Sequence, residues 1–329
     1  MRYVNKLWIV LVLFLAACQK DDDTTETNGN WVKRSAFDGV ARNQAVAFVL
    51  GDKAYVGTGF DGEKRLNDFW MYDPTLDSWT QQADFIGSKR NSAVAFAAAD
   101  KGYVGTGYDG TNRLDDFYSF DPVNNTWSAI ASFPGSGRLG AVAFALNSKG
   151  YVGTGYDGNY LKDFYSYDPS SDSWTKEISI LGNKRTDAVA FVINNTAYVA
   201  TGNNNGQYIN DMYSFDGTNW EKKREISDVS DDDYDNSYAI VREKAVAFVM
   251  NNMGYITTGN KSGLSTEVWE YDPVEDLWDT KTSFEGVARS GAVAFSINNR
   301  GFVALGSSLS QQFDDIYEFF PNAEYEEND

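Results

Sequence analysis

Short apolar runs separated by polar turns recur along the chain at a nearly constant spacing. The run Ala-Val-Ala-Phe occurs six times, at Ala45–Phe48, Ala93–Phe96, Ala141–Phe144, Ala188–Phe191, Ala245–Phe248 and Ala292–Phe295. The intervals between these boxes are 48, 48, 47, 57 and 47 residues. A period of this length is typical of a radial or linear array of repeated units rather than of an ordinary enzyme domain.

Each repeated unit contains signals for several short β-strands. Ala45–Val49 is mostly apolar, as a strand buried on both faces should be, and Ala54–Gly59 is rich in β-forming residues. Asp68–Tyr72 alternates and stops at an Asp-Pro turn, after which Trp79 begins a fourth run. Four strands per unit predict an antiparallel sheet, and six such sheets predict an all-β, six-bladed β-propeller with few exposed edges.

The first and last units complement each other. Trp79 and Arg90 are separated by 11 residues, and the same interval separates Trp31 from Arg42, although Trp31 precedes the first box. The sixth unit ends at Pro321 without a tryptophan. We therefore expect the N-terminal strand around Trp31 to complete the last blade, which places the propeller at residues 31–321 and leaves 322–329 as an acidic C-terminal tail.

The N-terminus predicts a lipoprotein. Arg2 and Lys6 precede an apolar stretch too short to form a stable membrane span, so residues 1–17 are predicted to be a signal peptide. The Leu-Ala-Ala segment before Cys18 resembles the bacterial lipobox, which implies lipidation of Cys18. Residues 18–30 are predicted to form a flexible acidic tether. Asp21–Asp23 resemble the acidic export tag of Bacteroidetes-type surface lipoproteins, which implies an outer-membrane lipoprotein whose surface or periplasmic orientation stays open.

Charge and composition exclude several functions. With 28 basic and 47 acidic residues the formal net charge is −19, which opposes binding to nucleic acids and to anionic lipid surfaces. The chain has no histidine, which excludes histidine-dependent triads and imidazole-rich metal sites. It has one cysteine, so no disulfide can form within the chain.

The repeat resembles the kelch motif. Gly107–Leu114, followed by Tyr118, an Asp-Pro pair and Trp127, is similar to the kelch pattern, and the resemblance extends from Trp31 to Pro321. It implies a kelch propeller like that of galactose oxidase, without the copper site, which needs histidines. The family usually has a Gly-Gly doublet after the second strand, whereas this chain has Thr-Gly in five units and Leu-Gly in the sixth.

Residues shared by all units are predicted to serve the scaffold. One arginine precedes each inner strand, and we expect each to form an ion pair that holds its loop: Arg42, Arg90, Arg138, Arg185, Arg242 and Arg289. The alternative is an anion site that these arginines line near the channel. The tryptophans are predicted to lie in the core between blades, with an aromatic platform for carbohydrate as the alternative: Trp79, Trp127, Trp174, Trp220 and Trp278.

Binding specificity is expected where the units differ. The two residues after each arginine vary, and so do the connections between the second and third strands. The resemblance implies that both sets share the face that binds ligands. Tyr108, Tyr156 and Tyr208 are the predicted anchors, and the other candidates are Arg65, Arg113, Asn43, Gln44, Asn91, Thr186, Asp187 and Asn204. Ordinary solvated turns are the alternative.

An acidic insertion of eleven residues separates the fourth and fifth units. Asp231, Asp233 and Asp235 alternate as in a calcium-binding loop, but Asn236 and Arg242 stand where that loop needs glycine and glutamate. We predict no cofactor, with calcium at these aspartates as the alternative to a flexible acidic loop.

These features favour a lipid-anchored binding module that recognises a protein or a glycan in the cell envelope. Two alternatives stay open. One is a carbohydrate-active enzyme of the epimerase or mutarotase type that uses carboxylates, for which no catalytic residue can be assigned. The other is a structural component of the cell surface.

Overall fold

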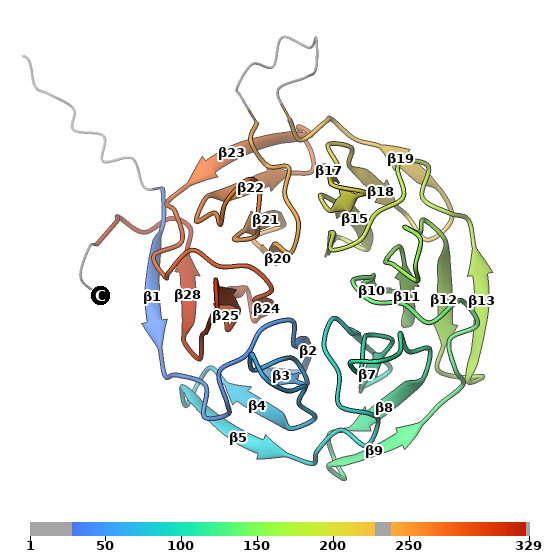
Figure 1. Ribbon diagram of the computed structural model, residues 1–329. Helices are drawn as coiled ribbons and strands as arrows, with labels where there is room; N and C mark the ends of the chain where they lie inside the picture. The colour runs from blue at the N-terminus through green and yellow to red at the C-terminus, as the bar shows by residue number, and fades with distance from the viewer. Residues whose placement is uncertain (1–27, 228–237, 327–329) are drawn as a thin grey trace, which may run out of the picture.

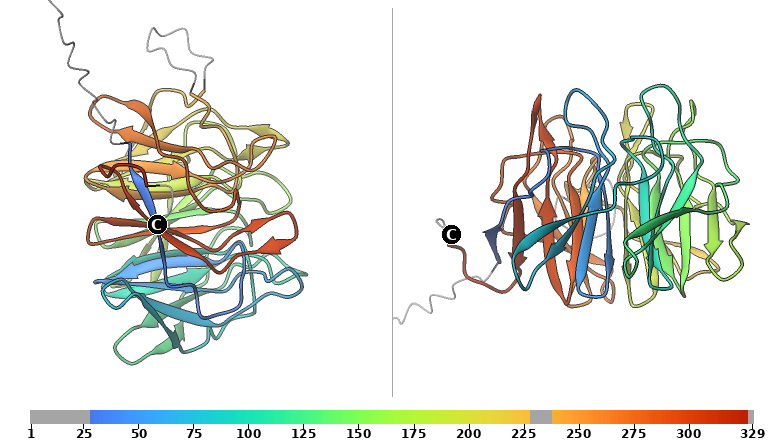
Figure 2. Two further views of the ribbon diagram at one scale, coloured as in Figure 1. Left: turned by 90° about the vertical axis from the view of Figure 1, so that its left-hand side faces the viewer. Right: turned by 90° about the horizontal axis from the view of Figure 1, so that it is seen from below.

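The protein is a ring of six β-sheets around a central channel (Figure 1). This computed structural model describes residues 28–227 and 238–326. Each sheet has four antiparallel strands, and no helix occurs in the described ranges. Seen from the side, the ring is a disc whose loops lie on two opposite faces (Figure 2). The predicted all-β, six-bladed propeller is therefore confirmed.

The blades follow one another along the chain, and each begins with its innermost strand. Blades 1 to 3 consist of β2 (Val46–Leu50), β3 (Lys53–Gly57), β4 (Phe69–Asp73) and β5 (Ser78–Gln82); β6 (Val94–Ala98), β7 (Lys101–Gly105), β8 (Phe117–Asp121) and β9 (Thr126–Ala129); and β10 (Val142–Leu146), β11 (Lys149–Gly153), β12 (Phe164–Asp168) and β13 (Ser173–Glu177).

Blades 4 to 6 keep this order, with two additions. They consist of β14 (Val189–Ile193), β15 (Thr196–Ala200), β18 (Tyr213–Phe215) and β19 (Trp220–Lys222); β20 (Val246–Met250), β21 (Met253–Thr257), β22 (Val268–Asp272) and β23 (Leu277–Lys281); and β24 (Val293–Ile297), β25 (Arg300–Ala304), β28 (Ile316–Phe320) and β1 (Asn30–Arg34). Two small hairpins rise from these blades: β16 (Asn203–Asn204) with β17 (Gln207–Tyr208), and β26 (Ser307–Ser308) with β27 (Gln311–Gln312).

Large and small residues alternate between neighbouring blades. Val46 and Phe48 of blade 1 are buried against the alanines of the next box, Ala93 and Ala95. The Phe48 ring also covers Gly102, where a Cβ atom would come within 2.1 Å of the ring. The Ala-Val-Ala-Phe box thus presents its valine and phenylalanine to one neighbouring blade and its alanines to the other, which lets the blades pack closely.

The tryptophans join the outer parts of adjacent blades. Trp127 of blade 2 packs edge-on against Phe69 and Phe85, with ring centroids 4.9 and 5.0 Å away. Its indole N–H donates to the carbonyl of Ala83 at 3.0 Å. Trp79, Trp127, Trp220 and Trp278 are buried and Trp174 is half-buried, which confirms their predicted place in the core between blades.

The N-terminal strand closes the ring. β1 pairs antiparallel with β28, with Trp31 opposite Phe319, and forms the outermost strand of blade 6 (Figure 1). Trp31 is fully buried, and its indole N–H donates to the carbonyl of Thr282 at 3.3 Å. This arrangement repeats that of Trp127, so the predicted closure through Trp31 is confirmed.

The folded part extends beyond the predicted boundaries at both ends. The tether was expected to reach Asn30, but Asn30 lies in β1 and the carbonyl of Asn28 accepts a hydrogen bond from Thr282 N–H at 2.9 Å. The tail was expected to begin at residue 322, but Glu326 N–H donates to the Asn30 side chain at 2.9 Å. These hydrogen bonds are polar and involve no apolar pattern, which is why the sequence did not indicate them.

The departure from a Gly-Gly doublet places threonine in a left-handed conformation. Thr58, Thr106, Thr154, Thr201 and Thr258 have φ between 56° and 64°, and all are fully buried. This conformation is uncommon for a β-branched residue. The second glycine is required by sterics as well as by φ, because a Cβ atom on Gly107 would lie 2.9 Å from the carbonyl oxygen of Asn91. The chain therefore keeps the tight exit of the second strand and fills the first position with a buried side chain.

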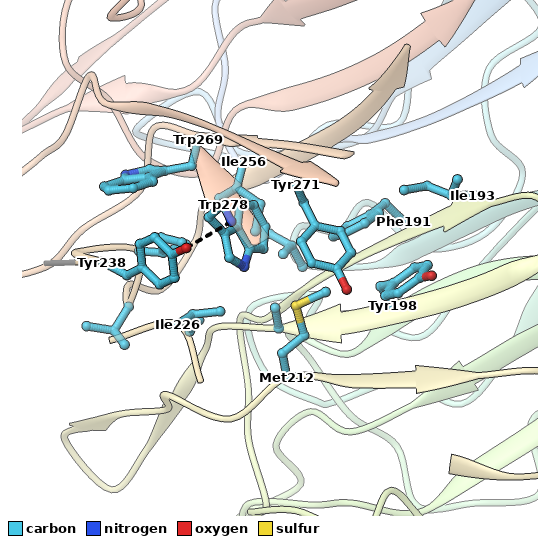
Figure 3. Packing of buried hydrophobic residues seen from close by; sticks show 14 residues of the cluster. Phe191, Ile193, Tyr198, Met212, Ile226, Tyr238, Ile256, Trp269, Tyr271 and Trp278 are labelled. Carbon is cyan, nitrogen blue, oxygen red and sulfur yellow. Dashed lines mark hydrogen bonds between the residues drawn. The ribbon is translucent and has the colours of Figure 1, made fainter. Parts of the chain in front are cut away.

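The insertion between blades 4 and 5 is anchored in the core at both ends. Ile226 and Ile240 are fully buried, and the Tyr238 hydroxyl accepts a hydrogen bond from Trp278 N–H at 3.2 Å (Figure 3). The predicted flexible loop therefore does not extend to these flanking residues. Asp231, Asp233 and Asp235 lie outside the described residues.

Candidate ligand-binding face

The repeated arginines belong to the scaffold. All six are at most 1% exposed, and each contacts an acid of its own blade: Asp68, Asp116, Asp163, Asp211, Glu267 or Asp315. Arg90 is representative, because its guanidinium binds both carboxylate oxygens of Asp116 at 2.6 and 2.8 Å and the carbonyl of Thr106 at 3.0 Å. The predicted ion pairs are confirmed, and the alternative of an anion site lined by these arginines is wrong because their charges are already neutralised.

The ion pair between Arg42 and Asp68 lowers the pKa of the acid, and its two side chains differ in exposure. Burial opposes ionisation of Asp68, but the hydrogen bonds and positive charge of Arg42 outweigh it, and the pKa of Asp68 is lowered. The acid is partly accessible while the arginine is not: the Asp68 side chain is 23% exposed and that of Arg42 is 0% exposed. Water can therefore reach the Asp68 carboxylate, but it cannot replace that carboxylate as the partner of the buried Arg42 guanidinium.

Two rings of backbone hydrogen bonds join the blades on the face that carries these arginines. In the first ring, the second residue after each arginine donates its N–H to the matching carbonyl of the preceding blade at 2.7–3.1 Å: Gln44, Ser92, Gly140, Asp187, Lys244 and Gly291. In the second ring, the glycine that follows each second strand donates to the carbonyl of the next blade's arginine, as Gly59 does to Arg90 at 2.8 Å. Adjacent blades are thus connected by one bond in each direction.

The first ring surrounds the mouth of the channel. Its residues have φ between 50° and 63°, and their side chains differ from blade to blade. Below it lies a cavity of about 190 Å³ lined by the Ala-Val-Ala segments of all six inner strands. No side chain of this lining can ionise. The polar and charged groups available to a ligand therefore lie at the mouth and not in the channel.

Three further rows of variable residues extend outward from the mouth. The first residue after each arginine pairs with the start of the loop between the second and third strands, as Asn43 does with Phe60. In every blade the residue at the start of this loop also pairs with the end of the same loop, as Phe60 does with Arg65. The middle row is Phe60, Tyr108, Tyr156, Asn203, Asn260 and Ser307, and the outer row is Arg65, Arg113, Tyr160, Tyr208, Leu264 and Gln312. The loops therefore place the non-repeating residues together on one face.

Blades 1 to 3 form an aromatic and cationic sector. The Arg65 guanidinium lies over the Tyr108 ring at 4.6 Å and near the Phe60 ring at 5.4 Å. The Arg113 guanidinium lies over the Tyr156 ring at 4.9 Å, and Tyr156 contacts Tyr160 with ring centroids 5.1 Å apart. We call this set the stacked strip: Phe60, Arg65, Tyr108, Arg113, Tyr156 and Tyr160.

Most of the predicted candidates meet in this sector. Asn91 accepts a hydrogen bond from the Arg65 side chain at 2.7 Å and donates to the Gln44 side chain. Asn43 donates to Ser307 at 2.7 Å, which links blade 1 to blade 6. Phe60 and Tyr160 were not among the predicted candidates, although they occupy the same repeat positions as Tyr108 and Arg113, and aligning the units by position would have identified them.

Blade 4 carries the remaining candidates, which lie apart from the strip. Tyr208 is half-buried, packs against the core, and accepts a hydrogen bond from Ser262 N–H at 3.3 Å. Asn204 pairs with Gln207 in the small hairpin and is half-buried. Thr186 is buried and donates to the carbonyl of Gly140 at 3.2 Å. The three tyrosines thus belong to one face but not to one cluster.

Asp187, at the mouth of the channel, has a carboxyl group with a raised pKa. Burial raises the pKa of its carboxyl to about 6; Glu243 adds to this effect, while Lys244 and Thr186 oppose it. Because the pKa is higher in the folded protein than the usual Asp value of about 3.9, the stabilising contribution of protonated Asp187 is present at low pH and is lost as the pH rises through about 6.

Replacing Asp187 with Asn is therefore expected to stabilise the protein above pH 7, by ~1–3 kcal/mol, and to change little near pH 4. Thermal unfolding at pH 4, 6 and 8 would measure this. Asp157 is the matched control. Its pKa is lowered, because hydrogen bonds from Ser136 and Asn159 outweigh the effect of burial, so Asp157→Asn should lower stability at pH 8. Equal effects of Asp187→Asn at pH 4 and pH 8 would contradict the assignment.

Comparison with known proteins agrees with this architecture. The family model described as "KLHDC2/KLHL20/DRC7 Kelch-repeats domain" matches residues 23–137 and 133–307. The chain belongs to the kelch-repeat family, and this membership indicates a protein-binding module. A solved structure described as "Structure of YjhT" aligns with a TM-score of 0.71 and 18% sequence identity, over 85% of this chain and 95% of that chain, which shows a shared fold.

A search of curated proteins returned no match. Residues 28–227 and 238–326 include no helix that is long and apolar enough to cross a membrane. The same ranges contain no group of three or more acidic, histidine or cysteine side chains arranged to hold a metal ion.

Proposed function

We propose that this protein is a lipid-anchored binding module of the outer membrane that holds a protein or glycan partner on the face described above. The observation that carries the proposal is the segregation of residues on that face. The arginines that repeat in every blade are buried and paired, whereas the positions that vary surround the channel mouth, where most of them are half-buried. A face of this kind can recognise one partner without any change in the scaffold.

The partner is expected to depend on the three tyrosines. Replacing Tyr108, Tyr156 and Tyr208 together with Ala should weaken binding by ~2–4 kcal/mol, because aromatic anchors dominate many interfaces. A glycan array and a pull-down from outer membranes would identify the partner, and titration calorimetry would measure the loss.

A triple substitution on the opposite face of the disc is the matched control. Leu76, Val123 and Val274 lie in the turns that connect the third and fourth strands, and they are 72%, 89% and 86% exposed. Their replacement with Ala should leave binding unchanged. Thermal unfolding of both triple variants separates lost contacts from lost folding. Binding that survives the tyrosine variant with the fold intact would place the site elsewhere.

The anchor can be tested separately. Cys18→Ala is expected to move the protein from the membrane fraction to the soluble fraction, because lipidation at the resembled lipobox needs the thiol. Cell fractionation followed by immunoblotting measures the distribution, and Cys18→Ser serves as a second variant without a lipidation site. Protease treatment of intact cells then distinguishes a surface-exposed protein from a periplasmic one. Retention of both variants in the membrane would contradict the anchor.

Asp187 favours an enzyme of the epimerase or mutarotase type as the second candidate function. A carboxyl group with a pKa of about 6 at the mouth could transfer a proton to or from a sugar near neutral pH. Nuclear magnetic resonance would detect such activity as faster interconversion of sugar anomers, or as hydrogen exchange at the carbon next to the carbonyl of the open-chain sugar. Activity that disappears in Asp187→Asn would favour the enzyme over the binding module.

A further inference from the structure

Two arginines on neighbouring blades lie on the ligand face. Arg65 donates a hydrogen bond from Nε to the Asn91 side chain and lies near the Phe60 and Tyr108 rings. Arg113 is exposed, and its guanidinium lies over the Tyr156 ring. Neither forms an ion pair with any residue in the described ranges, whereas the scaffold arginines do. In a chain with a net charge of −19, two unneutralised guanidinium groups on one face need an explanation.

The two arginines stack on the tyrosines of neighbouring blades, Arg65 on Tyr108 and Arg113 on Tyr156. The Arg65 guanidinium lies 4.6 Å from the centre of the Tyr108 ring, and Tyr108 is paired with Arg113 across its own loop. Directly paired residues of antiparallel segments have Cα atoms about 4.5–5.5 Å apart. The Tyr108 hydroxyl donates to the carbonyl of Gly110 at 2.8 Å, which holds the ring in place. The two guanidinium groups therefore lie on aromatic rings of the same face, and the backbones that carry Tyr108 and Arg113 are adjacent.

Three aspartates of these loops accept hydrogen bonds from the backbone of their own turns. Asp61 accepts hydrogen bonds from the backbone N–H groups of Glu63 and Lys64, both at 2.8 Å. Asp109 accepts from the backbone N–H groups of Thr111 and Asn112 at 2.7 and 2.6 Å. Asp157 accepts from Asn159 N–H at 2.8 Å. The positive charge of Arg65 helps to lower the pKa of Asp109, but none of these three carboxylates forms an ion pair with either arginine.

We propose that the stacked strip binds an acidic segment of a partner protein, with the guanidinium groups of Arg65 and Arg113 each receiving a carboxylate. This inference rests on the proposed function and names the chemistry of the partner. A guanidinium that is stacked on a ring keeps its N–H edges available, and its planar fork matches a carboxylate. Each guanidinium also covers one face of Tyr108 or Tyr156, which removes ring surface that a sugar would use for stacking. An extended acidic peptide therefore fits this strip better than a neutral glycan.

The test uses an array of ten-residue peptides that carry two glutamates at separations of one to five residues, in a background of Gly, Ser and Leu. The full-length protein in detergent is expected to bind the best glutamate peptides at least tenfold more tightly than the same peptides with glutamine. Raising the salt concentration from 50 to 500 mM should weaken this binding, because the contact is ionic. The double variant Arg65→Gln, Arg113→Gln should lose the tenfold preference.

Lys64→Gln is the control for each single substitution, Arg65→Gln or Arg113→Gln, since Lys64 is exposed in the same loop as Arg65 and each change removes one positive charge. It should alter binding less than threefold, and Arg65→Lys should retain only part of the preference. Equal binding of glutamate and glutamine peptides would overturn the proposal, and so would an unchanged double variant or a preference for uronic-acid oligosaccharides over every peptide. A photo-crosslinker at Asn204, on blade 4, tests the binding face independently. A captured envelope partner with no preference for acidic peptides would reject the acidic segment and leave the binding module intact.

Discussion

Deletion of residues 30–36 is expected to abolish the single cooperative unfolding of the propeller and to cause association. The deletion removes β1, which exposes the edge of β28 and leaves blade 6 with three strands. It also removes Trp31, whose ring packs against Phe284 and Phe319 with centroids 5.0 and 4.7 Å away. Loss of one buried tryptophan costs ~3–5 kcal/mol, a large part of the ~5–15 kcal/mol that stabilises a typical protein. Calorimetry and light scattering would record both effects.

Single substitutions separate the contribution of the Trp31 side chain to stability from that of the whole β1 strand. Trp31→Ala and Trp127→Ala should lower the free energy of unfolding by similar amounts, because both indoles lie between a phenylalanine of the preceding blade and an aromatic residue of their own. Lys33→Ala, in the same strand but exposed, should change it by less than ~0.5 kcal/mol. A melting curve that is unaffected by the deletion would show that β1 does not close the ring.

Asp116→Asn is expected to lower the free energy of unfolding by about 3 kcal/mol, the low end of the range for breaking a buried ion pair. Arg90 is fully buried and cannot replace the lost carboxylate with water. It keeps hydrogen bonds to the carbonyls of Ser88 and Thr106 and its contact with the Phe85 ring, which limits the loss. Chemical denaturation of the variant and the parent would measure the difference.

The neighbouring acid provides the control for this pair. Asp115→Asn makes the same change of charge one residue away on an exposed side chain, so its effect should be within ~0.5 kcal/mol. The double variant Arg90→Met, Asp116→Asn should recover part of the loss, because it removes the unpaired buried charge. A double variant that is less stable than Asp116→Asn would mean that Arg90 acts mainly through its backbone and ring contacts.

Much of the fold could be predicted because the repeat fixes distances. The interval of 11 residues from Trp31 to Arg42 was enough to assign the first strand to the last blade, and β1 pairs with β28 as expected. The ends of the folded part could not be predicted in the same way. Asn28 and Glu326 are held by polar contacts, which leave no periodic pattern in a sequence.

The candidate site was predictable as a face but not as a set of contacts. Variation between units indicated loops that the structure brings together on one face, yet the grouping of Arg65, Tyr108 and Asn91 depends on how neighbouring blades approach one another. Tyr208 looked equivalent to Tyr108 by residue type, but the irregular fourth unit places it on a separate hairpin against the core. Residue type indicates what a side chain can bind, whereas the geometry of adjacent blades decides which side chains act together.

The two rings of hydrogen bonds between blades are made by backbone atoms alone. Any residue that tolerates a positive φ can occupy the first ring, at a cost of ~1–2 kcal/mol where it is not glycine, asparagine or aspartate. Glutamine, serine, lysine and glycine already occupy equivalent places at Gln44, Ser92, Lys244 and Gly140. The side chains at the mouth can therefore change one blade at a time. A new binding specificity could evolve in this way while the propeller that carries these side chains stays the same.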